Sequence, residues 1–182
     1  MDENHVEHGR AAYDRGEYDT AVEAFEEMRL LWQQAGDKRG EARALSDLGV
    51  AQQKLGNLAD AHQAYEEALA LYEAIDDEQG KAVVMGNLAT LMRLRGATDQ
   101  AESLLQEAAD LFSTQDDRER EAATLRLLAR LQLRRGVWLD ALLNYNRALD
   151  HMGRLTSRQK LLRGLTHLFL RIIGVRVDGD TG

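Results

Sequence analysis

Residues 44–73 read ALSDLGVAQQKLGNLADAHQAYEEALALYE, with apolar residues three and four positions apart on either side of Gly56. This spacing predicts two amphipathic helices, and the glycine between them accepts the left-handed turn that ends the first. The chain has no proline and no cysteine, and alanine, leucine, glutamate and arginine are abundant. Such a composition favours helix and excludes disulfide and thiolate chemistry.

The same pattern returns every 40 residues along the chain. The turn glycines are Gly16, Gly56, Gly96 and Gly136. The small residues after each turn are Ala21, Ala61, Ala101 and Ala141, and the large ones are Phe25, Tyr65, Leu105 and Tyr145. A further small column, Gly9, Gly49, Ala89 and Ala129, indicates that two helices approach closely there. One helix pair cannot bury its apolar face by itself, so successive pairs must stack on one another.

The periodicity predicts an all-α fold of four helix-turn-helix repeats, at about 1–36, 37–76, 77–116 and 117–153. The expected helices cover residues 3–15, 18–35, 39–55, 58–75, 79–95, 98–114, 118–135 and 138–152. A ninth, at 156–173, belongs to a C-terminal segment, 154–182. Trp32 and Trp138 are expected to pack between helices.

The columns of small residue, glycine, alanine and aromatic residue resemble the tetratricopeptide repeat. The 40-residue period, with segments such as MGNLATLMRLRG, resembles the longer-repeat subclass of Pins-type adaptors and kinesin light chains. The resemblance covers residues 1–153. It implies an α-α superhelix, or solenoid, in which the first helix of each pair lines a concave groove. It also implies a scaffold or adaptor that binds other proteins.

The charge pattern suggests which kind of partner the implied groove accepts. The net charge is −8, with +4 from residue 154 onward and −12 before it, so nucleic acid is not an expected ligand. Arg126, Arg130 and Arg134 lie four residues apart, with no carboxylate three or four positions from the first two. They predict contacts to an acidic peptide or helix; the alternative is a solvated basic face.

Three further groove residues are expected on the helix predicted at residues 79–95. By resemblance, Asn87 would hold the backbone of a bound peptide. However, the equivalent positions carry Asp47 and Leu127, so the asparagine ladder is incomplete. Thr90 and Arg93 are its expected neighbours in the groove, with Val50 and Lys54 nearby.

The C-terminal segment carries an apolar stripe with basic residues around it. The stripe consists of Leu161, Leu165, Leu168, Phe169 and Ile172. One interpretation is a helix that caps the fourth repeat. The alternative is a structural subunit or assembly factor, which docks through residues 156–177 on a membrane surface, a larger complex or a second copy of the chain.

No constellation of residues predicts an enzyme, a cofactor or a metal site. His5 and His8 are three residues apart but lack a third ligand, and no Ser-His-Asp arrangement can be nominated. The acidic pairs at Asp76 and Asp116 lack calcium-loop spacing, and the glycines follow helices and so form no phosphate-binding loop. The polar start of the chain and the lack of a long apolar run favour a cytoplasmic protein.

Overall fold

The computed structural model describes residues 3–152 and 155–172, and the side chains of residues 7–152 and 155–169. These residues form helices and no strand, as predicted. The pairs are α1 (Glu3–Asp14) with α2 (Tyr18–Ala35), α3 (Lys38–Leu55) with α4 (Leu58–Glu73), α5 (Glu78–Leu94) with α6 (Thr98–Thr114), and α7 (Arg118–Arg134) with α8 (Trp138–Asp150). A further helix, α9 (Ser157–Ile172), follows them. Predicted and observed ends differ by at most two residues, the usual uncertainty of helix ends.

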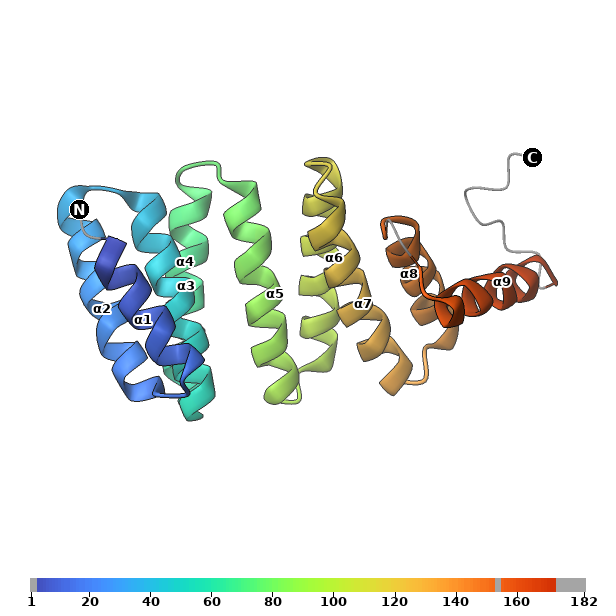
Figure 1. The fold of residues 1–182 in the computed structure, drawn as a ribbon, viewed down its shortest axis with the longest axis horizontal. Helices are drawn as coiled ribbons and strands as arrows, with labels where there is room; N and C mark the ends of the chain where they lie inside the picture. The colour runs from blue at the N-terminus through green and yellow to red at the C-terminus, as the bar shows by residue number, and fades with distance from the viewer. Residues whose placement is uncertain (1–2, 153–154, 173–182) are drawn as a thin grey trace. The chain divides into compact units, whose positions relative to one another are not determined.

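The chain divides into two compact units, Met1–Leu111 and Phe112–Gly182, and the boundary falls inside α6. In the N-terminal unit the helices from α1 to α5 follow one another as neighbours (Figure 1). In the C-terminal unit α7 packs along α8, and α9 contacts α8. The predicted domain boundary near residue 153 stays a prediction.

The turns repeat as regularly as the helices. The glycines predicted to end the first helix of each pair have positive φ: +80° at Gly16, +86° at Gly56, +79° at Gly96 and +79° at Gly136. Between pairs, the same left-handed conformation occurs at Gly36, Asp76 and Asp116. The next residue, Asp37, Asp77 or Asp117, accepts a hydrogen bond from the backbone three residues later. The acidic pairs therefore build turns and helix caps.

The core joins large side chains of one helix to small residues of its neighbour. A Cβ atom built on Gly49 would lie 2.6 Å from Cε1 of Tyr65, whose side chain is fully buried. A Cβ atom on Gly9 would lie 2.8 Å from Cε1 of Phe25. The close approach predicted for this column is therefore confirmed at both glycines. In the third repeat the equivalent columns carry Ala89 and the smaller Leu105.

A pair of glycine substitutions tests this packing within the N-terminal unit. We expect Gly49→Ala to lower the free energy of unfolding by about 1–3 kcal/mol, because the new methyl overlaps the Tyr65 ring. Gly86→Ala is the matched control, since a Cβ there meets nothing within 4 Å. Alanine in that helix interior should raise stability by about 0.5–1 kcal/mol. Urea titrations followed by circular dichroism would measure the free energy of unfolding of both variants. Equal changes in this free energy would contradict the close packing of Tyr65 on Gly49.

Candidate partner-binding faces

The arginine row of α7, formed by Arg126, Arg130 and Arg134, is exposed. Its members follow one another at about 6 Å along the helix axis, given the rise of an α-helix. The opposite side of α7 is buried in the core through Leu125, Leu128, Ala129 and Leu131. Within the part of the chain that the structure describes, the three guanidinium groups form no ion pair or hydrogen bond. The row is therefore available to a ligand.

Two leucines that the sequence analysis did not nominate flank the arginine row. Leu127 is 44% exposed and Leu133 is 48% exposed. By helical periodicity they lie on opposite sides of Arg130. A helical-wheel projection could have found them, because both positions fall outside the buried arc of α7. The face therefore combines cations with apolar surface.

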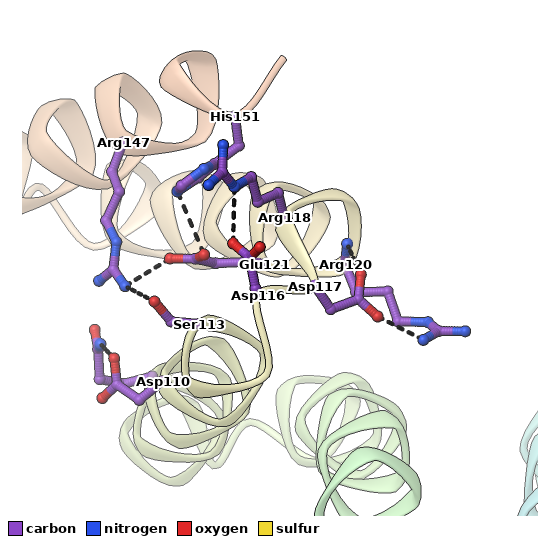
Figure 2. A network of polar contacts seen from close by, with 10 residues as sticks. Asp110, Ser113, Asp116, Asp117, Arg118, Arg120, Glu121, Arg147 and His151 are labelled. Carbon is purple, nitrogen blue, oxygen red and sulfur yellow. Dashed lines mark hydrogen bonds and ion pairs between the residues drawn. The ribbon is translucent and has the colours of Figure 1, made fainter. Parts of the chain in front are cut away.

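A buried carboxylate fixes α7 against α8. Glu121, in the first turn of α7, is 2% exposed. Its carboxylate oxygens lie 2.6 Å from Nη2 of Arg147 and 3.3 Å from Nε2 of His151 (Figure 2). Arg147 also donates a hydrogen bond of 3.2 Å to Oγ of Ser113. These contacts join the first turn of α7 to α8, on top of the apolar packing of Leu125 and Leu128.

The other three predicted groove residues lie on α5, in the N-terminal unit. Asn87 Nδ2 donates to Oγ of Ser46 on α3 at 3.3 Å, so it bridges two first helices. The Thr90 hydroxyl donates to the carbonyl of Gly86 at 3.2 Å. Arg93 is exposed and makes no ion pair among the described residues. The six predicted residues therefore form two sets of three, one on α5 and one on α7.

The neighbouring helix α3 carries a carboxylate on the equivalent face. Asp47 is half-buried, and its Oδ2 lies 3.7 Å from Nη2 of Arg10 on α1. Burial raises the pKa of the Asp47 carboxyl, and the positive charges of Arg10 and Arg43 oppose that shift. Val50 is half-buried and Lys54 is exposed. With its own carboxylate, this face suits an acidic ligand less well than α7 does.

In the N-terminal unit, residues of α2, α3 and α4 line a pocket of about 300 Å³ that is open to solvent. Leu45 and Leu48 contribute to its apolar lining. Its charged residues are Glu26, Arg29, Asp60 and Glu67, and Arg29 is paired with Glu26 at 2.5 Å. The remaining charges are acidic, so this pocket does not fit the acidic ligand predicted from the sequence.

The apolar stripe of α9 is open to solvent along its described part. The exposed fractions are 66% for Leu161, 55% for Leu165, 57% for Leu168 and 49% for Phe169. The side chain of Ile172, the fifth predicted member, lies outside the described residues. The helix α9 follows the fourth pair as predicted. However, these four exposed side chains do not form its contact with α8.

The two tryptophans lie in different environments. Trp32 is half-buried, and its indole covers Gly40, where a Cβ atom would lie 2.5 Å from Cδ2 of the ring. Trp138 is 68% exposed, so the predicted packing role is wrong for this residue. It is the first residue of α8.

Among the described residues, no three His, Asp or Glu side chains come together as metal ligands would. Nor is any described helix both long and apolar enough to cross a bilayer.

Helix pairs that stack on one another define a class of helical-repeat proteins that act as protein-interaction scaffolds. The family model for the tetratricopeptide repeat matches residues 3–74 and 80–153, and the chain belongs to this family. No curated protein matches the sequence.

Several solved structures share the fold. BtubC (BKLC) from P. vanneervenii has a TM-score of 0.74 at 19% identity, with 88% of this chain and 69% of that chain covered. TPR-like repeats of a Podosopora anserina kinesin light chain have a TM-score of 0.65 at 15% identity, with 93% and 95% covered. MamA has a TM-score of 0.62 at 17% identity, with 94% and 86% covered. The expected likeness to kinesin light chain repeats is confirmed for the fold.

Proposed function

We propose that this protein is a scaffold that binds an acidic peptide or helix along the arginine row of α7 and catalyses no reaction. One observation carries the proposal. Arg126, Arg130 and Arg134 are exposed in one row without ion-pair partners among the described residues, between the exposed side chains of Leu127 and Leu133. Membership of the tetratricopeptide repeat family supports a binding role in general.

The spacing of the row defines the ligand that fits it. Carboxylates four residues apart on a helix repeat at about 6 Å, which matches the arginines. Alternate side chains of an extended segment repeat at about 6.6 Å, which also fits over three positions. Each guanidinium can bind a carboxylate through two parallel hydrogen bonds. A bound acidic segment would also relieve the repulsion between arginines four residues apart.

In this proposal Asn87, Thr90 and Arg93 of α5 form a second face that contacts the ligand. Arg93 offers the same chemistry as the arginine row, and Asn87 and Thr90 offer polar groups to a peptide backbone. Asn87 and Thr90 already have partners within the helices, so Arg93 is the member of this set that should affect affinity most.

Charge reversal in the row tests the proposal. A labelled helical peptide with glutamate at every fourth position is titrated against the wild type and Arg126→Glu/Arg130→Glu by fluorescence anisotropy. We expect the variant to bind at least about tenfold more weakly, a loss of roughly 1.4 kcal/mol. The wild-type affinity should also fall as salt is raised, because exposed charges are screened.

The matched control is Lys38→Glu/Arg95→Glu, which changes the net charge equally at two exposed positions of the N-terminal unit. Neither residue makes an ion pair within the described part of the chain. The control should keep nearly all of the wild-type affinity. Equal losses in both variants would reduce the interaction to nonspecific attraction, and unchanged affinity in Arg126→Glu/Arg130→Glu would remove the row from the function.

A further inference from the structure

The amphipathic helix α9 contacts α8 with its polar side. Thr166 is 4% exposed, although it is polar. Arg163 Nη2 lies 2.6 Å from Oδ1 of Asp150, at the end of α8, and Gln159 Nε2 donates to Sδ of Met152 at 4.0 Å. Meanwhile Leu161 and Leu165, on the other side of the helix, are 66% and 55% exposed. The helix is therefore oriented opposite to an ordinary surface helix, which buries its apolar side.

The charges around this apolar side all have one sign. Residues 157–172 contain no aspartate or glutamate, and their basic residues are Arg158, Lys160, Arg163 and Arg171. Arg158 and Lys160 are exposed at the start of the helix, next to Leu161. The compact unit that carries α9 has 13 basic and 8 acidic residues, whereas the chain as a whole has a net charge of −8. The surface that covers α9 should therefore be both apolar and anionic.

We infer that α9 docks on an anionic lipid surface, with its leucines and Phe169 inserted at the boundary between headgroups and acyl chains. A helix of 16 residues is about 24 Å long and can lie flat in that interface. Exposed Arg158 and Lys160 would reach the lipid phosphates while their aliphatic stems follow the apolar stripe. Because the polar side of α9 already contacts α8, docking requires no unpacking of the helix.

The same charges disfavour a second copy of the chain as the occupant. Two α9 helices facing each other would bring their cations together, and neither helix has a carboxylate to compensate. An anionic bilayer supplies both the apolar environment and the opposite charge.

Flotation of the full-length protein with vesicles tests the inference. One set of vesicles is phosphatidylcholine, and in the other about a third of the lipid is phosphatidylglycerol. We expect the wild type to float with the anionic vesicles and to bind the neutral ones at least about tenfold more weakly. Leu165→Glu/Phe169→Glu should lose at least about tenfold in binding to anionic vesicles, because both carboxylates face the lipid.

The matched control is Leu30→Glu/Leu31→Glu, because these leucines of α2 are 41% and 43% exposed and the change in charge is the same. It should float like the wild type, and circular dichroism checks that both variants fold.

No flotation of the wild type, or equal flotation of the α9 variant, overturns the inference. So does loss of flotation in Arg126→Glu/Arg130→Glu alone, which would assign lipid contact to α7. A wild-type dimer that becomes monomeric in Leu165→Glu/Phe169→Glu, without vesicle binding, would identify a second copy as the occupant.

Discussion

Replacing Arg147 by methionine is expected to destabilise the C-terminal unit by about 3–5 kcal/mol. The substitution keeps most of the aliphatic stem but leaves the Glu121 carboxylate, which is 2% exposed, without its closest cation. Removing one partner of a buried charge leaves part of its desolvation penalty uncompensated. The remaining partner, Nε2 of His151, is farther away, at 3.3 Å.

Hydrogen exchange measured by mass spectrometry locates this loss. Amides of α7 and α8 should exchange roughly a hundredfold or more faster in Arg147→Met, because each 1.4 kcal/mol corresponds to about tenfold. Amides of α3 and α4, in the N-terminal unit, should exchange at the wild-type rate.

Two further variants compare this ion pair, in which Glu121 is buried and the Arg147 side chain is 40% exposed, with a pair that is exposed on both sides. Arg118→Met removes a similar pair, Nε to Oδ1 of Asp116 at 2.9 Å, whose side chains are 67% and 80% exposed (Figure 2). That loss should cost less than about 1 kcal/mol. Arg147→Met/Glu121→Met should recover much of the lost stability, because apolar residues often replace a buried ion pair at little cost. Equal effects of Arg147→Met and Arg118→Met would contradict the role assigned to Glu121.

In the N-terminal unit, Tyr65→Ala is expected to lower the free energy of unfolding by about 3–5 kcal/mol. The side chain is fully buried, and its ring fills the space above Gly49. Truncation opens a cavity that a glycine cannot fill. Hydrogen exchange of the backbone amides should become faster in α3 and α4, while the amides of α7 and α8 should exchange at the wild-type rate.

Tyr65→Phe is the control, and it adds a test by pH. The Tyr65 hydroxyl donates to Oε1 of Gln53 at 3.4 Å, so its removal should cost less than about 1 kcal/mol near neutral pH. Burial raises the pKa of this hydroxyl above its usual value of about 10. The wild type therefore loses stability as the pH rises beyond about 10, and Tyr65→Phe should lose less. A phenylalanine variant as unstable as the alanine variant would show that the hydroxyl, not the ring, stabilises this core.

The 40-residue columns were enough to predict the helix pairs, their ends and the close approaches at Gly9 and Gly49. Those features depend on local rules: a glycine at a left-handed turn, an aspartate at a helix cap, and apolar residues at helical spacing. The same periodicity placed the exposed arginine row, since residues four apart share one side of any helix. The chain therefore encodes its repeat and its basic face in short-range sequence.

Only the tertiary structure decided the features that depend on contacts between different helices. Glu121 occupies a column shared with Glu41 and Lys81, so nothing in the sequence marks it as buried. It becomes buried because α8 brings Arg147 and His151 to it. The exposure of Trp138, and the polar contacts that leave the stripe of α9 uncovered, likewise depend on how the helices pack and not on helical periodicity. Helical periodicity shows which residues share a side of a helix, but only packing determines which side is buried.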